Sequence, residues 1–270
     1  MNKEVLVIIP AYNEAENIDR VLSELEEPPI ADFADILIID DGSSDDTGER
    51  AKKRGHAVVE HIYNLGYGTA LQSGYKYAVR KKYKYVIQMD ADGQHDVQNV
   101  TNIYNALKEK TPEGRYPDIV LGARYMEGSA PFNASMLKKL AVWMFRKLIY
   151  LTTKVDLHDP TTGLQGLSRP AFMYYSKFNH FADECPDSDM LIQMITLKFQ
   201  VIEIPAVMHE RKTGKSMHAG LEPVWYMIRG LYEILSVIMR YKILKLDEGI
   251  GNYETVRQEE KDSDKEEAAR

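Results

Sequence analysis

The chain has one cysteine, Cys185, among 270 residues, so no disulfide can form within it. It also lacks an uninterrupted apolar run of about 18 residues, the length at which a membrane-spanning helix is expected. The opening MNKEVLVIIPAYNE has too short an apolar run for a secretory signal peptide, and an acid precedes that run. These absences favour a protein that works in a reducing cytoplasmic compartment without spanning the membrane.

A G-x-G-x-x-G turn directly after the first predicted strand is also missing. A dinucleotide-dependent oxidoreductase on a Rossmann sheet carries that turn there, because its backbone holds the pyrophosphate. Here the first strand runs into PAYNE, and the glycines of LGYGTALQSG follow the third predicted strand. The oxidoreductase class is therefore disfavoured, while a non-catalytic nucleotide-binding module stays open.

Little of the formal charge of −7 belongs to the body of the protein. Residues 247–270 contain nine acids and four bases, and we expect this acidic tail to be disordered. The remainder has the composition of an ordinary globular domain, with 44% hydrophobic residues in the whole chain. Nothing in it indicates a nucleic-acid partner.

Short β-branched strands alternate with amphipathic helices through the first half of the chain. This alternation predicts an α/β fold, a mostly parallel sheet with helices on both faces. Asn13 and either Ser43 or Ser44 are the expected N-caps of the first two helices. The predicted strands span 4–9, 34–39, 56–60, 84–89 and 118–121, and two further helices span 67–80 and 97–108.

Acidic clusters follow three of these strands, where ligands bind in parallel sheets. In YVIQMDADGQHD, Asp90 and Asp92 are one residue apart, and Gln94 offers a third oxygen. Mg²⁺ typically takes one or two carboxylates together with substrate phosphates, so the spacing predicts a divalent cation and a phosphorylated ligand. The alternative is a solvated turn in which Asp96 caps the next helix.

The other two clusters suggest a nucleotide. Asp40 or Asp41 is a candidate for accepting hydrogen bonds from a nucleobase or ribose, and Tyr12 for stacking on the base. A common Asp-Gly turn and a half-buried packing tyrosine are the plainer interpretations.

Together, IPAYNEAENI, ILIIDDGSSDDT, LGYGTALQSGY and YVIQMDADGQHD resemble glycosyltransferase family 2, which has the GT-A fold. The resemblance runs from about Val5 to Ser216 and is nearest to the branch of dolichyl- and polyprenyl-phosphate sugar synthases. It implies an inverting transferase that uses Mg²⁺ or Mn²⁺ and a nucleotide diphosphate sugar. Asp41 is compatible with uracil and with guanine, so UDP and GDP donors both stay open.

The resemblance also implies roles for individual residues. Arg124, in LGARY, would reach a phosphate of donor or acceptor. The loop HERKTGKSMHAG would fold over the diphosphate with Arg211 and Lys215. The implied nucleotide-sugar ligands are Pro10, Tyr12, Glu14, Asp40, Asp41, Gly68 and Asp90, and the implied metal ligands are Asp90, Asp92 and Gln94.

Two acids are candidates for a general base. Asp187 and Asp189, in ECPDSDMLIQM, fit loosely the acidic pair that many family members place before an apolar helix. A hydroxyl acceptor needs a base to take its proton, whereas a lipid phosphate is already an anion. The plainer interpretation is that Asp187 or Ser188 caps the helix.

Two amphipathic stretches bear on the acceptor. Residues 134–155 carry five bases and no acid, and residues 223–246 have one narrow polar stripe. Such helices with Trp143 and Trp225 suit the headgroup region of an anionic membrane, although packing against the domain or in a homodimer would also explain them.

We therefore expect a catalytic domain over 1–222, with a nucleotide-sugar half to about 125 and an acceptor half from 126. A membrane-interface helix over 223–246 would follow, and then the tail over 247–270. The expected acceptor is a polyprenyl-phosphate-type lipid at the cytoplasmic membrane face. The alternative is a soluble enzyme adding sugar to a saccharide or protein hydroxyl in polysaccharide or glycoconjugate synthesis.

Overall fold

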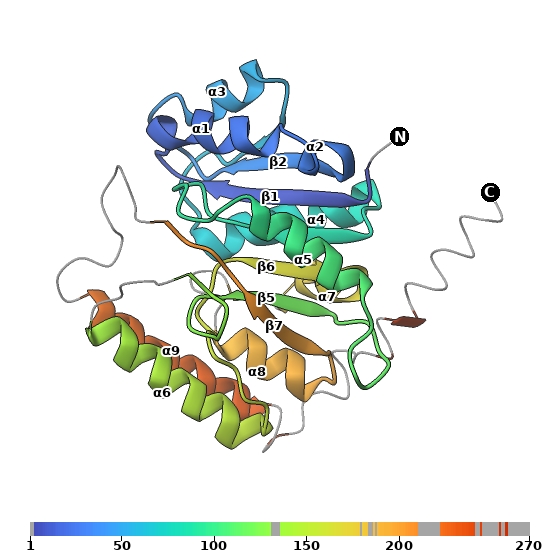
Figure 1. The fold of residues 1–270 in the computed structure, drawn as a ribbon. Helices are drawn as coiled ribbons and strands as arrows, with labels where there is room; N and C mark the ends of the chain where they lie inside the picture. The colour runs from blue at the N-terminus through green and yellow to red at the C-terminus, as the bar shows by residue number, and fades with distance from the viewer. Residues whose placement is uncertain are drawn as a thin grey trace.

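A seven-stranded sheet runs through the protein (Figure 1). The computed structural model describes residues 3–130, 136–178, 180–182, 186, 188–209 and 222–240, with single residues at 244, 254, 257 and 258. In this part of the chain the strand order is β3-β2-β1-β4-β6-β5-β7, and only β6 runs antiparallel to its neighbours. The strands are β1 Val5–Ala11, β2 Ala34–Asp40, β3 Ala57–Glu60, β4 Tyr85–Gln88, β5 Ile119–Ala123, β6 Gln165–Ser168 and β7 Val201–Pro205.

Helices cover both faces of the sheet because the central strands are apolar on both sides. In β1, Val5, Val7 and Ile9 pack against one face, whereas Leu6 and Ile8 pack against the other. The first face is covered by α1 Ala15–Leu25, α3 Thr47–Lys53 and α5 Gln98–Lys108. The second is covered by α4 Tyr67–Lys81, α7 Arg169–Ser176 and α8 Ser188–Thr196, and the short α2 Ile30–Phe33 precedes β2. The predicted α/β fold is confirmed.

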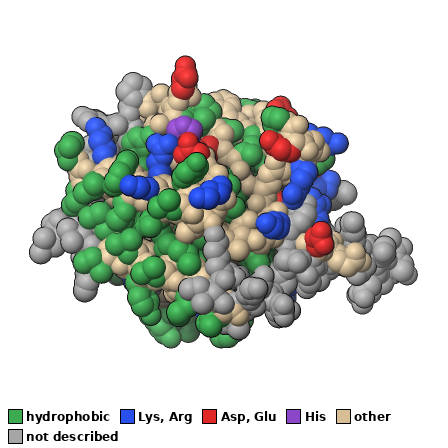
Figure 2. Space-filling model, turned by 90° about the horizontal axis from the view of Figure 1, so that it is seen from below, with side chains coloured by type: hydrophobic (Ala, Val, Ile, Leu, Met, Phe, Trp, Pro, Cys, Tyr) green, Lys and Arg blue, Asp and Glu red, His purple; other side chains and the backbone are tan. Residues whose placement is uncertain are grey.

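Two long helices, α6 Met136–Thr153 and α9 Glu222–Ile238, lie side by side on the outside of the second layer (Figure 1). Each buries one face: Phe145 of α6 and Ile234 of α9 are 1% exposed. Their outer faces are also apolar, and the side of the molecule where they lie shows a broad hydrophobic area bordered by Lys and Arg (Figure 2). No helix in the described ranges is both long enough and apolar enough to cross a bilayer. Nearly all of the acidic tail lies outside those ranges.

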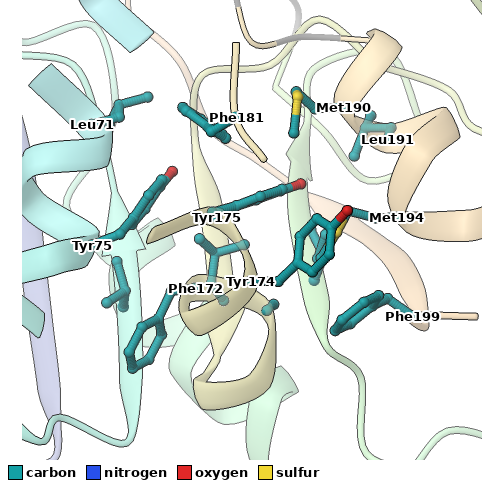
Figure 3. Packing of buried hydrophobic residues seen from close by; sticks show 14 of the residues in the cluster. Leu71, Tyr75, Phe172, Tyr174, Tyr175, Phe181, Met190, Leu191, Met194 and Phe199 are labelled. Atoms are coloured by element: carbon teal, nitrogen blue, oxygen red, sulfur yellow. The ribbon is translucent and has the colours of Figure 1, made fainter. Parts of the chain in front are cut away.

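An aromatic cluster joins α4 and α7 to α8 (Figure 3). The ring of Phe181 lies 5.2 Å from that of Tyr75 and 4.7 Å from that of Tyr175. On the far side of α7, the ring of Tyr174 lies 5.7 Å from that of Phe199. Tyr75 donates a hydrogen bond to the side chain of Gln88 on β4, so its hydroxyl is satisfied in the core. This layer fixes the side of the sheet on which α6 and α9 lie.

The first two predicted helices correspond to α1 and α3. Both begin later than predicted, and their expected caps are wrong. The N-cap of α1 is Glu14, and Asn13 has a left-handed backbone with φ of 55°. The Asn13 side chain instead accepts hydrogen bonds from Ser44. The N-cap of α3 is Asp46, not Ser43 or Ser44. These polar side chains stabilise contacts between two loops rather than the helix that each precedes.

Gly166 allows α5 to pack closely on β6. We therefore predict that substitutions at Gly166 and Ile103 have non-additive effects on the free energy of unfolding. A Cβ at Gly166 would overlap Ile103 Cγ2, so Gly166→Ala should lower the free energy of unfolding by about 1–3 kcal/mol. Ile103→Ala alone should cost about 2–5 kcal/mol through the cavity it leaves. Because Ile103→Ala also removes the overlapping methyl, the double variant should cost less than the sum by at least about 0.5 kcal/mol in denaturant unfolding. Strictly additive costs would contradict this packing.

Candidate active site

The carboxyl ends of β2, β1 and β4 lie next to one another because these strands are adjacent and parallel. The loop after β1 is bonded to the loop after β2: Asn13 Oδ1 accepts from Ser44 N at 2.8 Å, and Thr47 Oγ1 accepts from Glu14 N at 2.9 Å. Arg20 of α1 reaches the loop after β4 and donates to Gly93 O at 3.4 Å. The three polar clusters singled out from the sequence therefore meet at one edge.

Asp41 is buried at this edge, with 4% of its surface exposed. Its carboxylate accepts from His61 Nδ1 at 2.6 Å and from Leu65 N and Gly66 N at 2.9 Å each. It thereby holds the β3–α4 loop, including the N-cap of α4, against the end of β2. Asp40 is 7% exposed and accepts from Ser43 N at 2.9 Å. Both acids predicted to bind a base thus have protein partners that fix their positions.

The other residues predicted to line a nucleotide pocket surround the same edge. Pro10 is buried near the end of β1, and Tyr12 just beyond it is 49% exposed. Glu14 is half-buried and accepts from Asn17 Nδ2 at 2.7 Å. Gly68 is buried in the first turn of α4. The exposed ring of Tyr12 is therefore accessible for stacking on a planar ligand. Pro10 and Gly68 are buried and contribute to the backbone conformation of this edge.

Asp90 is held by donors from two elements. Oδ1 accepts from the hydroxyl of Tyr67 on α4 at 3.1 Å, and Oδ2 lies 3.3 Å from His95 Nε2. Burial raises the pKa of Asp90, but the hydrogen bonds from His95 and Tyr67 and the charge of Arg124 outweigh it, so the pKa lies below its usual value. Gly163 passes so close that a side chain there would touch the Asp90 carboxylate. The acid is therefore ionised at neutral pH and fixed in position.

Asp92 and Gln94 lie on the same loop, two and four residues after Asp90. Asp92 Oδ1 accepts from Gln94 N at 3.0 Å, which tightens the turn. Gln94 Nε2 donates to His209 O at 3.3 Å, and His209 N donates back to Gln94 O at 2.7 Å. The side-chain oxygen of Gln94 is then the atom that a cation would use. The loop after β4 is thus tied to the segment that follows β7.

Arg124, at the end of β5, is clamped by the buried carboxylate of Asp159. Arg124 Nε and Nη2 donate to the two oxygens of Asp159 at 2.6 and 2.7 Å, and Nη2 also donates to Thr161 Oγ1 at 2.9 Å. Asp159 N in turn donates to Glu203 Oε1 at 2.8 Å. Breaking a buried, hydrogen-bonded ion pair of this kind is costly. The series of hydrogen bonds from Glu203 through Asp159 to Arg124 therefore fixes one orientation of the guanidinium.

Lys138 of α6 faces the same edge and was not singled out as a site residue from the sequence. Burial lowers its pKa, and the charge of Arg124 lowers it further, whereas the charge of Asp92 raises it. Lys138 is therefore within electrostatic reach of Arg124 and Asp92. Its only sequence signal was membership of the basic stretch 134–155.

Three of the residues predicted from the sequence, Asp187, Arg211 and Lys215, lie outside the described residues. Asp189 lies in the first turn of α8 and is 7% exposed. Its negative charge adds to burial in raising the pKa of Tyr175. A carboxylate enclosed in this way is shielded from solvent.

The sequence did not identify three residues that position the predicted site residues. They are His61 beside Asp41, His95 beside Asp90, and Glu203, which holds Asp159. No local pattern marks a histidine at 61 or a glutamate at 203 as the partner of an acid tens of residues away. Asp159, by contrast, begins the motif DPTTG, although its pairing with Arg124 was not evident.

The ligand set at Asp90, Asp92 and Gln94 suits a hard divalent cation. It offers two carboxylates and an amide oxygen, the ligand types that Mg²⁺ and Mn²⁺ accept. No group of three or more His, Cys, Asp and Glu side chains converges on a metal position in the part of the chain that the structure describes. Binding would therefore depend on further oxygens from the diphosphate of a donor, so the residues present fit a cation that arrives with its substrate.

Solved structures of one sugar transferase have a similar fold. The chain superposes on glucosyl-3-phosphoglycerate synthase from Mycobacterium tuberculosis with a TM-score of 0.63 and 21% identity, covering 87% of this chain and 80% of that one. The same enzyme has been solved with Mn²⁺, UDP and glucosyl-3-phosphoglycerate, and there the TM-score is 0.59 at 17% identity, covering 88% and 79%. At these identities the likeness shows the fold alone, which is GT-A.

Curated relatives have similar sequences over most of the chain. Polyprenol monophosphomannose synthase of Mycolicibacterium smegmatis is 28% identical over 232 residues, covering 81% of this chain and 82% of the relative. Undecaprenyl-phosphate mannosyltransferase of Micrococcus luteus is 26% identical over 227 residues, covering 80% and 88%.

The family model described as glycosyl transferase family 2 matches residues 6–175, from β1 to the last turn of α7. That range contains the loops after β1, β2, β4 and β5 that form the edge described above. The chain belongs to glycosyl transferase family 2, and it is a glycosyltransferase with the GT-A fold whose sequence fits the dolichyl- and polyprenyl-phosphate branch.

Proposed function

We propose that this glycosyltransferase moves a sugar from a nucleotide diphosphate sugar to a lipid-borne phosphate of the polyprenyl-phosphate type, with inversion at the sugar carbon. One observation carries the proposal. Acidic Asp90 and Asp92 lie within electrostatic reach of cationic Arg124 and Lys138, on a sheet edge beside a helix whose outer face is apolar. A diphosphate donor and a phosphate acceptor need such a pairing of cation-binding acids with basic groups.

The nucleotide would lie along the ends of β1 and β2. Tyr12 offers an exposed ring for stacking on the base, and Asp40 and Asp41 set the backbone positions that meet the base and ribose. Pro10, Glu14 and Gly68 line the approach, and Arg211 and Lys215 are proposed to contact the diphosphate. Both UDP and GDP sugars are compatible with these groups.

Asp90, Asp92 and Gln94 would hold Mg²⁺ or Mn²⁺ against the donor's diphosphate. The cation supplies positive charge where negative charge develops on the leaving diphosphate. Tyr67 and His95 keep Asp90 in place while the bond between the sugar carbon and the diphosphate oxygen breaks. Preorganised charges of this type act without rearranging during the reaction.

The acceptor phosphate would be held by Arg124 and Lys138. One of its oxygens attacks the sugar carbon from the face opposite the leaving diphosphate, forming the new carbon–oxygen bond. A phosphate oxygen is already anionic, so no general base is needed. The enclosure of Asp189 accords with that chemistry, and Asp187 keeps a proposed role only if the acceptor is a hydroxyl.

The acceptor's lipid chain requires a membrane contact, and we assign it to α6 and α9. Leu140, Trp143 and Leu151 on α6 are 52–58% exposed. Ile228, Tyr232 and Leu235 on α9, and Met239 directly after it, are 51–73% exposed. The α9 residues recur at spacings of four, three and four, so they form one stripe along the helix. The protein would lie peripherally at the cytoplasmic face of the membrane. The proposed helix region 223–246 includes most of α9, which packs through Ile234 on the proposed unit 1–222.

A phosphate-bearing small molecule is the second candidate acceptor. Arg124 and Lys138 would suit any phosphate monoester, and the solved enzyme of similar fold was crystallised with phosphoglyceric acid. A water-soluble acceptor would leave the apolar stripes on α6 and α9 without a function.

Removing Asp92 should abolish transfer through loss of the cation. We expect Asp92→Ala to lower turnover of UDP- or GDP-sugars by at least about 100-fold. The Mn²⁺-dependent rise in melting temperature with the nucleotide should also disappear. Asp32→Ala, an exposed acid on α2, is the control and should behave as wild type. Unchanged turnover in Asp92→Ala would refute the metal assignment.

Removing Lys138 should weaken the acceptor and spare the donor. With a short polyprenyl phosphate such as farnesyl phosphate, Lys138→Ala should raise the acceptor KM by at least about 10-fold, because a hydrogen bond between charged groups is lost. Donor binding, followed by thermal shift, should stay within about two-fold. Lys110→Ala removes the same charge from the α5–β5 turn and serves as the control. An equal loss of donor binding would contradict this assignment, because it would show that Lys138 contacts the donor rather than the acceptor.

Replacing apolar side chains on the outer faces of α6 and α9 should release the protein from vesicles. Wild-type protein should float with anionic liposomes, and Leu140→Ser combined with Tyr232→Ser should reduce the bound fraction at least about 10-fold, because each side chain contributes about 1.5–3 kcal/mol when buried. Ile62→Ser changes a 96% exposed residue beyond β3, the strand at the opposite end of the sheet, and should float normally. Wild-type protein that stays in solution would favour the soluble acceptor.

A further inference from the structure

A pocket of about 170 Å³ opens between α6 and the segment that leads from it to β6. Its lining is formed by Tyr125, Lys139, Val142, Trp143, Arg146 and His158. None of these residues belongs to the donor, metal or acceptor groups assigned above. The mechanism therefore leaves this pocket without a function.

The pocket collects positive charge and hydrogen-bond donors from two sides. Lys139 and Arg146 are seven residues apart on α6, two turns along the same side of the helix. Arg146 Nη2 lies 3.4 Å from Asp156 Oδ1, but that carboxylate is 66% exposed, so the pair is weak. The exposed carboxylate of Asp156 offsets only part of the positive charge of Lys139 and Arg146. The remaining charge favours an anionic ligand.

The opposite wall adds two donors. His158 Nδ1 lies 2.9 Å from Glu203 Oε2, which leaves its other ring nitrogen, Nε2, for a ligand. Burial raises the pKa of Tyr125, so its phenol keeps its proton and can donate to an anion. Guanidinium, ammonium and phenol groups around one small pocket match the oxygens of a phosphate.

The mouth of the pocket is apolar and continuous with the outer face of α6. Trp143 lines the pocket and is 58% exposed, and Leu140, one turn before it, is 52% exposed. A free phosphate ion would gain nothing from this surface. A phospholipid would place its phosphate on Lys139 and Arg146 and its acyl chains along the exposed stripe.

We propose that this pocket binds the headgroup phosphate of an anionic phospholipid and thereby orients the enzyme on the membrane. The proposal rests on the membrane contact assigned to α6 and α9. Its site is distinct from that of the acceptor phosphate, because Lys138, which lies near Asp92, and Lys139 point about 100° apart on the helix.

The pocket and the catalytic edge share one wall. Arg124 Cζ lies 5.3 Å from the centre of the Tyr125 ring, and His158 directly precedes Asp159, the partner of Arg124. A lipid headgroup against Tyr125 and His158 would thus sit at a fixed offset from Arg124. The acceptor phosphate lies at the same depth in the membrane. It would therefore reach Arg124 without a further rotation of the enzyme on the membrane surface.

Binding of a monomeric lipid tests the pocket without vesicles or turnover. In a Trp225→Phe background Trp143 is the sole tryptophan of the full chain, so its fluorescence reports on the pocket. Titration with dihexanoyl phosphatidylglycerol below its micellar concentration should give a saturable change. Lys139→Ala and Arg146→Ala should each weaken binding at least about 10-fold, the usual scale for a lost hydrogen bond to a charged group.

Lys110→Ala is the charge-matched control, because Lys110 is exposed in the α5–β5 turn and lies outside the pocket lining. Lys147 is unsuitable, since its ammonium lies 5.2 Å from the centre of the Trp143 ring, the reporter. Lys110→Ala should keep affinity within about two-fold. Dihexanoyl phosphatidylcholine, with no net charge, should bind at least about 10-fold more weakly than the anionic lipid. The proposal is overturned if Lys110→Ala weakens binding as much as Lys139→Ala, if the zwitterionic lipid binds equally well, or if inorganic phosphate alone matches phosphatidylglycerol. Because transfer is not measured, a wrong acceptor assignment would leave this result intact.

Discussion

The crowding of carboxylates at one edge of the sheet is the constraint around which this end of the protein is built. Parallel pairing of β2, β1 and β4 brings Asp40, Asp41, Asp90 and Asp92 together, and close like charges are costly unless cations or donors offset them. Each acid meets that cost differently. Asp41 takes three donors from the β3–α4 loop, whereas Asp90 takes Tyr67 and His95. Asp92 lies close enough to Lys138 to influence its pKa. The charge that remains is what a donor-bound cation would neutralise.

Arg124 shows how the strands beyond β4 contribute to this edge. β5 and β7 lie on the far side of the antiparallel β6, yet Glu203 on β7 holds the backbone of residue 159, whose carboxylate holds Arg124 at the end of β5. The guanidinium is therefore oriented by a strand that contributes no ligand itself. A long, flexible side chain becomes a fixed positive charge because its buried partner is in turn fixed by a second acid.

The sequence predicted the strands and loops of the first 125 residues well because local signals coincide there. Apolar, β-branched runs end in polar clusters, and parallel pairing brings the ends of those runs to one edge of the sheet. Partners distant in sequence left no such signal: His61 for Asp41, Asp159 for Arg124 and Lys138 beside Asp92 are brought together only by the folded chain. Helix starts were misplaced for a related reason, since the side chain of Asn13 bonds to the next loop instead of capping its own helix.

The proposed acceptor site and the proposed membrane contact share one helix, α6. On α6, Lys138 lies within electrostatic reach of Asp92, and Leu140 and Trp143, within two turns of it, are exposed. α9 was expected to present a narrow polar stripe, but Arg229 and Glu233 of that stripe pair with each other and are half-buried, and Tyr232 and Leu235 are the exposed residues. An anionic acceptor needs cations and no base, and a lipid acceptor needs an apolar approach. A helix that offers a cation on one side and apolar residues on the other would meet both needs at once, which supports the proposed lipid phosphate over a sugar hydroxyl.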